Sequence, residues 1–261
     1  MKAYSRENIR NVAIAGHGAR GKTTLAEAML YLSGASDRLG RVADGNTVLD
    51  FDAEEKKRKV SVSSALANFE WRDRKINIID TPGLFDFEGG RAEGLRAAES
   101  VIVVLSCGHN VDVGAEKTLR AAGRKGISKF IAVTKCDGED RDFFKTLNSL
   151  KDKYGTAICP VVIPYVVGGK VECYVNFLQN KAFKYDNGKA TQVDMPSDAL
   201  IDDIHAAFTE AVASADDELM MKFFDGEEFT HDEIVAGLSQ GVLDGTVIPV
   251  YACSGLTTDA V

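Results

Sequence analysis

The sequence is poor in the residues that build zinc sites, disulfide frameworks and membrane spans. Its 261 residues include only five cysteines and four histidines, all far apart and without a CxxC pair. This pattern disfavours a structural zinc site, and an odd number of cysteines suits reduced thiols in the cytosol. The longest apolar runs, Val101–Leu105 and Pro160–Val167, are much shorter than the roughly 18 residues needed to cross a bilayer. We therefore expect a cytoplasmic protein with no membrane partner.

The sequence also has no surplus of positive charge. Its net charge is −8, from 31 basic and 39 acidic residues. Because a stand-alone DNA-binding protein needs many basic groups to neutralise phosphates, this balance argues against DNA as a partner. The chain is 45% hydrophobic and 27% charged, a balance typical of a globular protein long enough to bury a core.

The first part of the chain alternates between short apolar segments and amphipathic ones. Strands are expected at 11–15, 61–71, 75–79, 101–105 and 129–134, and helices at 22–32, 113–124 and 140–154. Strands that alternate with helices predict an α/β fold, with a mostly parallel sheet covered by helices.

The pattern changes near residue 157. Strands are expected there at 159–167, 170–177 and 181–185, then helices at 197–213, 216–224 and 230–238, and a last strand at 247–253. Turns are indicated at Gly168-Gly169 and Asn187-Gly188. We therefore predict one domain formed by 1–156 and 247–261, interrupted by an inserted α+β subdomain at 157–246.

The strongest motif lies between the first expected strand and the first expected helix. It fits GxxxxGK[ST] and, with the residue that follows, comprises Gly16, His17, Gly18, Ala19, Arg20, Gly21, Lys22, Thr23 and Thr24. Glycines let the backbone form a cradle of N–H donors, and a helix N-terminus favours anions. Lys22 would reach the terminal phosphates and Thr23 would offer its hydroxyl to magnesium, so the motif predicts a P-loop. The alternative is a glycine-rich turn that arose by chance.

A second motif, Asp80-Thr81-Pro82-Gly83, ends an expected strand. Asp80 would hold magnesium through a water molecule, and the Gly83 amide would contact the γ-phosphate. Taken alone, these four residues also suit an ordinary turn with proline at its second position. Their place after the P-loop favours the phosphate site.

Two further motifs point to guanine. Residues Thr134, Lys135, Cys136 and Asp137 fit [NT]KxD. The carboxylate of Asp137 can accept both the N1–H and the N2–H₂ donors of guanine, while the stem of Lys135 covers the base. Adenine has no matching donor pair, so Asp137 favours GTP over ATP. After the last expected strand, Ser254, Gly255 and Leu256 could turn backbone N–H groups towards guanine O6.

The charged segment before the second expected strand offers one more ligand. Ser61 could supply a second magnesium-binding hydroxyl from a mobile loop, although the charge run Glu54–Lys59 also fits a plain solvated loop. Our candidates for Mg²⁺ are therefore Thr23, Ser61 and Asp80. Our candidates for catalysis are Lys22, Ser61 and Gly83.

In this order and spacing, the motifs resemble those of translational GTPases, especially the nucleotide-binding domain of elongation factor G and its bacterial elongation factor G-like relatives. Segments 41–50 and 57–65 resemble the first switch of that family, and 80–87 resembles the second. The insertion at 157–246 resembles the extra subdomain of the elongation factor G group in its position and in its α+β pattern. The resemblance covers essentially the whole chain. It implies that the chain binds GTP and GDP with Mg²⁺ and hydrolyses GTP.

The resemblance also implies partners. In the family, the insertion contacts the ribosomal stalk protein, and further domains bind the ribosome with its RNA. The acidic stretch 194–233 could therefore be a partner surface, although a solvated helix face is the alternative. We expect the chain to be a monomeric part of a longer factor, ending before the family's closing helix.

Four positions depart from the family pattern. Leu84 replaces the histidine that orients the attacking water, and Thr134 replaces the usual asparagine. Ala19 replaces an aspartate associated with a monovalent cation, and Gly18 replaces an apolar residue. Leucine can neither form hydrogen bonds nor carry charge. A slow GTPase and a GTP-operated binding module with little hydrolysis are therefore both open readings, whereas Asp137 disfavours a metabolic ATP-using enzyme.

Overall fold

The computed structural model describes residues 2–138, 141–186 and 188–261. The strands are β1 (Ile9–Ala15), β2 (Ala65–Trp71), β3 (Arg74–Asp80), β4 (Ser100–Ser106), β5 (Ser128–Thr134), β6 (Ile158–Val167), β7 (Lys170–Asn176), β8 (Lys181–Asp186), β9 (Lys189–Val193) and β10 (Ile248–Ala252). The helices are α1 (Lys22–Leu32), α2 (Ala53–Arg58), α3 (Glu88–Ala97), α4 (Val113–Lys125), α5 (Phe143–Tyr154), α6 (Ala199–Ala213), α7 (Asp217–Asp225) and α8 (His231–Asp244).

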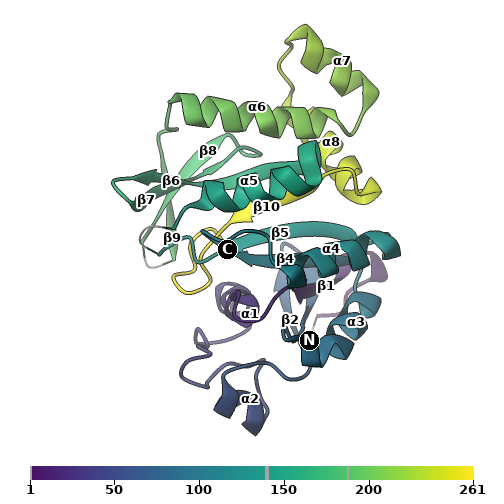
Figure 1. The fold of residues 1–261 in the computed structure, drawn as a ribbon, viewed down its shortest axis with the longest axis vertical. Coiled ribbons are helices and arrows are strands. Elements are labelled where there is room, and N and C mark those ends of the chain that lie inside the picture. Colours follow the sequence, from purple (N-terminus) through teal and green to yellow (C-terminus); the bar gives the residue numbers. More distant parts are fainter. Residues whose placement is uncertain (1, 139–140, 187) are drawn as a thin grey trace.

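All of these strands belong to one sheet, in the order β2-β3-β1-β4-β5-β10-β6-β7-β8-β9 (Figure 1). Within the stretch from β3 to β6 every pair of adjacent strands is parallel. The pairs at the two ends of the sheet are antiparallel. The predicted α/β fold, with a mostly parallel sheet covered by helices, is confirmed.

Alternate residues of the central strands face two hydrophobic cores. In β4, Val103 and Leu105 belong to one core with Leu119 of α4, while Val104 belongs to the other with Leu25 of α1. This period of two is the side-chain alternation of a strand covered on both faces. Burial on both faces explains why β4 reads as an uninterrupted apolar run.

The segment expected to be an insertion extends the same sheet. β6 pairs in parallel with β10, and β7 to β9 follow as an antiparallel meander. Figure 1 shows α6, α7 and α8 gathered at this end of the molecule, with α6 beside β6. The division into 1–156 with 247–261 and an inserted unit 157–246 stays a prediction.

Two local expectations near the second strand are wrong. The strand begins at Ala65 and not at residue 61, and the charge run is a helix, α2, and not a loop. Asp52 caps α2, and Glu55 completes a capping box. The same Glu55 accepts N–H donors from Val62 and Ser63, which keeps those residues out of the sheet.

Other boundaries were also missed. No helix was expected at α3 and no strand at β9, and α8 runs to Asp244, beyond the expected end at 238. The expected start of α5 at Asp140, and Asn187 of an expected turn, lie outside the described residues. Within the part of the chain that the structure describes, every helix is too short or too polar to span a membrane.

The parallel centre of the sheet gathers the motifs at one edge. The P-loop follows β1, Asp80 ends β3, Thr134 ends β5, and Ser254 follows β10. Because the carboxyl ends of parallel strands meet at the same edge, motifs far apart in the sequence become neighbours.

Candidate nucleotide-binding site

The loop between β1 and α1 needs glycine at two positions. Gly16 has a φ of +139°, and a Cβ there would lie 2.7 Å from the Val104 carbonyl oxygen. Gly21 has a φ of +92° and caps the N-terminus of α1. Both constraints follow from folding the backbone tightly around the helix start, which is the geometry of an anion cradle.

Lys22 lies inside this cradle. Its side chain is buried, and Nζ donates a hydrogen bond to the His17 carbonyl at 2.8 Å. Burial lowers the pKa of this amine, and the nearby Asp80 opposes that shift. Lys22, Gly18, Ser61 and other residues line a cavity of about 260 Å³. An anionic ligand there would meet a poorly solvated cation.

The three magnesium candidates lie together. The Thr23 hydroxyl donates to Asp80 at 2.6 Å and lies 3.2 Å from the Ser61 hydroxyl. The second carboxylate oxygen of Asp80 is buried without a hydrogen-bond partner among the described residues. Burial raises the pKa of Asp80 to about 7. An orphaned carboxylate oxygen beside two hydroxyls fits a hard divalent cation.

This oxygen set suits Mg²⁺ with a phosphate ligand better than an all-protein metal cage. Among the described residues, no group of three or more His, Cys, Asp or Glu side chains could hold a metal ion. Mg²⁺ is usually bound through one or two carboxylates together with substrate phosphates and water. The residues present therefore fit this ion.

Asp50 joins the cluster and was missed by sequence reasoning. It is buried, and it accepts a hydrogen bond from Ser61 at 2.7 Å. Burial is the main cause that raises its pKa. The only sequence signal is an acidic residue between the apolar residues Leu49 and Phe51, in the segment that resembles the first switch.

Glu27 of α1 forms hydrogen bonds with the backbone of the segment that contains Asp50. The side chain is fully buried, and one carboxylate oxygen accepts N–H donors from Val48 at 2.7 Å and Leu49 at 3.0 Å. These two bonds fix the chain just before Asp50. Sequence reasoning missed this residue too, because it lies on an otherwise ordinary helix.

We expect Glu27→Ala to lower the free energy of unfolding by about 1–3 kcal/mol, because it leaves the buried N–H of Leu49 and the part-buried N–H of Val48 without an acceptor. Glu27→Gln is the matched control, since its side chain keeps an acceptor oxygen and should lose less. Urea denaturation of the three proteins measures the difference. Equal stability of the alanine and glutamine variants would show that these bonds contribute nothing.

The second motif passes directly against the P-loop. A Cβ on Gly83 would lie 2.7 Å from the Gly18 nitrogen, so only glycine fits. Leu84 packs over Gly18, with its Cδ2 3.0 Å from where a Cβ of that glycine would be. The side chain is 39% exposed. The next residue, Phe85, packs on the His17 ring with centroids 5.5 Å apart.

The base-recognition motifs line a second cavity of about 280 Å³. Its walls include Thr24, Thr134, Lys135, Asp137, Ser254, Gly255 and Leu256. The two cavities share Gly21, Thr24 and Lys135, so they adjoin. Together they extend from Lys22, the predicted phosphate-binding residue, to Asp137, the predicted base-binding residue.

Thr134 and Lys135 brace this pocket. The Thr134 hydroxyl lies 2.6 Å from the carbonyl of Arg20, and Lys135 Nζ donates to the carbonyl of Ala19 at 2.8 Å. A Cβ on Gly255 would lie 2.9 Å from the Thr24 carbonyl, so the last motif packs tightly on α1.

Three P-loop residues lie outside both cavity linings: Gly16, His17 and Arg20. The Arg20 side chain pairs with Asp112 at 2.9 Å, at the start of α4. The part these three residues play in nucleotide binding stays a prediction, and it would rest on their backbone.

Comparison with known proteins identifies the family. Residues 7–261 match the family model of the elongation factor Tu GTP binding domain. The chain belongs to this family. The match confirms the resemblance to translational GTPases.

Two relatives show which members of the family the chain is similar to. The domain is 33% identical over 250 residues to the elongation factor G-like protein of Thermotoga maritima, a match that covers 96% of this chain and 36% of that protein. A crystal structure of a protein from Thermus thermophilus matches with a TM-score of 0.87 at 33% identity, over 96% of this chain and 38% of that one. The chain is a GTP-binding domain of the translational GTPases that is similar to the elongation factor G-like protein, and it spans little more than a third of these relatives.

Proposed function

We propose that this domain binds GTP and GDP with Mg²⁺ and hydrolyses the γ-phosphate slowly unless the ribosome contacts it. One observation carries the proposal. Lys22, Thr23 and Ser61 line a cavity that adjoins the pocket lined by Asp137. Asp80 lies outside that lining but accepts a hydrogen bond from Thr23. This arrangement supports the proposal, because the residues we assign to phosphate and to guanine line two adjoining cavities.

Each group has a role that follows from its place. The Lys22 ammonium and the P-loop amides would hold the phosphates and stabilise negative charge as the terminal group leaves. Thr23 and Ser61 would hold Mg²⁺ directly, and Asp80 would hold it through water. When bound, the ion neutralises charge on the phosphate oxygens. The Gly83 amide would orient the γ-phosphate for in-line attack by water.

Leu84 is the reason to expect slow hydrolysis. Its side chain lies over Gly18 beside the phosphate cavity, where it can neither orient nor deprotonate a water molecule. The same observation favours the second candidate function, a GTP-operated binding module whose switches sense the nucleotide with little turnover. Both functions use the same ground-state contacts.

Single-turnover GTP hydrolysis by the full-length protein, with and without ribosomes, separates these functions. We expect slow hydrolysis alone and a clear increase with ribosomes. No increase, with GTP binding intact, would favour the binding module.

In the full-length factor we propose the ribosome as partner, through its RNA and its stalk protein, and the cytoplasm as the place of action. The name of the Thermotoga maritima relative, an elongation factor G-like protein, supports this assignment. The acidic residues Asp202 and Asp203 are exposed on α6, where they could meet a basic surface.

Reversing both charges, with Asp202→Lys and Asp203→Lys, should weaken binding to the stalk protein roughly five-fold at low salt, because exposed charge pairs are individually weak. Surface plasmon resonance at two salt concentrations measures this effect, which should shrink as salt screens the charges. Reversal of Glu70 and Glu93, exposed on β2 and α3, is the matched control. Equal affinity of both double variants would leave α6 as a solvated face.

A further inference from the structure

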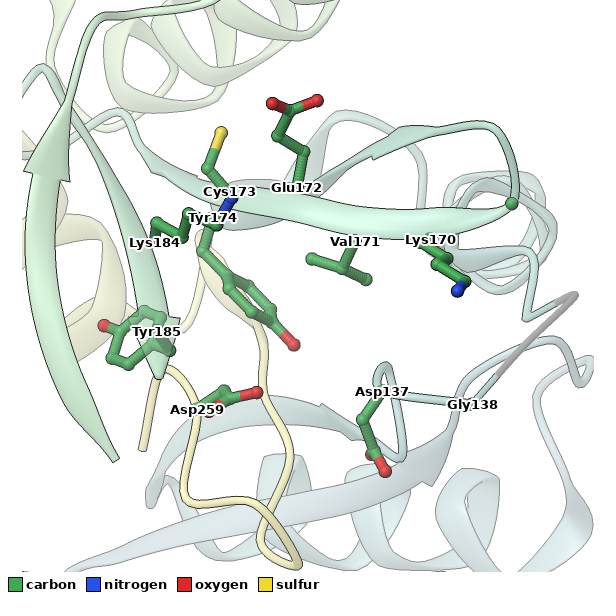
Figure 2. A pocket seen from close by; sticks show the side chains of 11 residues that line it. Asp137, Gly138, Lys170, Val171, Glu172, Cys173, Tyr174, Lys184, Tyr185 and Asp259 are labelled. Atoms are coloured by element: carbon green, nitrogen blue, oxygen red, sulfur yellow. The ribbon is translucent and has the colours of Figure 1, made fainter. Parts of the chain in front are cut away.

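A third cavity, of about 310 Å³, lies beside the base pocket (Figure 2). It shares Asp137 and Gly138 with that pocket, and its other walls include Tyr174 of β7, Tyr185 of β8 and Asp259. Its volume is at the lower end of ligand pockets, which span roughly 300–1,000 Å³, so it suits a small molecule. Apart from the shared Asp137 and Gly138, its lining residues have no part in the proposed handling of GTP.

Tyr174 gives the first sign of a ligand. The residue is only 3% exposed, and its hydroxyl has no hydrogen-bond partner among the described residues. Figure 2 shows this hydroxyl pointing out of β7 into the space above Asp137. Because folded proteins pair nearly all buried polar groups, an orphaned hydroxyl that lines a cavity points to a bound polar partner.

The charges around the cavity indicate what that partner is. The half-buried Asp259 faces the same space as Tyr174 (Figure 2). Burial raises the pKa of Asp259, and Asp137 adds to the shift. Within the described residues, neither of these carboxylates forms a salt bridge. The cavity lining has three carboxylates, from Asp137, Glu172 and Asp259, and two ammonium groups, from Lys170 and Lys184, so its net charge is −1.

Aromatic and apolar groups complete the site. The rings of Tyr174 and Tyr185 meet edge to face, with centroids 5.6 Å apart, and Val171 adds an apolar patch. Lys170 and Lys184 are exposed at the rim. Tyrosine rings attract organic cations, and a carboxylate and a hydroxyl oxygen can accept the N–H donors of an ammonium group.

We propose that this cavity binds a small primary alkylammonium compound, with its ammonium group between the Asp259 carboxylate and the Tyr174 hydroxyl and its alkyl chain against Val171. The proposal goes beyond nucleotide binding and does not depend on it.

The test titrates the full-length protein with n-butylammonium chloride, n-butanol and sodium butyrate, observed by NMR of ¹³C-labelled tyrosine rings. The Tyr174 signal, assigned from the spectrum of Tyr174→Phe, should shift saturably with the ammonium compound only. Butyrate binding as well as the ammonium compound, or no saturable shift with any of the three, would overturn the proposal. The titration itself uses the unmodified protein, and Tyr174→Phe is needed only to assign the signal.

Variants then locate the site by calorimetric titration with n-butylammonium. Tyr174→Phe and Asp259→Asn should each weaken binding about ten-fold or more, since each removes a hydrogen bond to a charged group. Tyr154→Phe, a tyrosine on α5 outside the cavity, is the matched control. Unchanged affinity in both cavity variants would contradict the assignment. GDP titrated in parallel separates the two proposals: intact GDP binding without ammonium binding overturns this one alone.

Discussion

Asp137→Asn should weaken GTP binding by about 100-fold or more, while it weakens binding of xanthosine triphosphate far less or strengthens it. The carboxylate can accept two donors from guanine, whereas an amide nitrogen would face those donors with its own N–H groups. Xanthine has a carbonyl at C2 that accepts such a donor. The position of Asp137 on the wall of the base pocket makes it the side chain that can read this edge.

Calorimetric titration of both nucleotides with Mg²⁺ measures the switch. Asp152→Asn, an exposed aspartate on α5, is the matched control and should bind both nucleotides like the unmodified protein. Equal losses for GTP and xanthosine triphosphate would mean that Asp137 does not contact the base.

Leu84→His should speed single-turnover GTP hydrolysis by about ten-fold or more. A positioned orienting or general-base group contributes roughly 10²–10⁴-fold, and we expect only part of this because Gly18 and Ala19 also depart from the family pattern. The leucine side chain packs over Gly18, which lines the phosphate cavity, so an imidazole at this position would lie next to that cavity.

The measurement compares the unmodified, Leu84→His and Leu84→Met proteins, each in excess over GTP and concentrated enough to bind all of it. Methionine is the control, because it changes the shape of the side chain without adding a group that can position water. GTP affinity should be similar in all three, since the contacts expected in the ground state come from Lys22 and Asp137. Turnover of several per second by the unmodified domain alone would refute this interpretation of Leu84.

The sheet and the motif positions were predictable because each motif follows an apolar strand, and the order of strands brings their ends together. The helices α2 and α3 were not. The sequence of α2 is almost entirely charged, so it has no apolar periodicity to indicate a helix. Asp52 and Glu55 nevertheless form the capping box that starts it. The glycines of α3 lower its helix propensity, so the sequence did not indicate a helix there. Gly94 is required by packing, because a Cβ there would lie 2.5 Å from the Thr81 side chain.

Tertiary contacts account for the functional residues that were missed. The contacts of Asp50 and Glu27 form only in the folded chain. The segment that resembles the first switch then packs on α1, where Glu27 binds its backbone, and Asp50 accepts a hydrogen bond from Ser61. The cavity that we propose for an ammonium compound joins β7 and β8 to the segments that contain Asp137 and Asp259, which are far from those two strands in the chain. No local pattern could have joined them.

The central claim is that this domain recognises guanine nucleotides. It is tested most directly by displacing fluorescently labelled GDP from the protein, in the presence of Mg²⁺, with unlabelled GTP or ATP. The account predicts displacement by GTP at concentrations similar to GDP, and a need for about 100-fold more ATP or greater, because adenine cannot satisfy Asp137. Displacement by ATP as effective as that by GTP would contradict it.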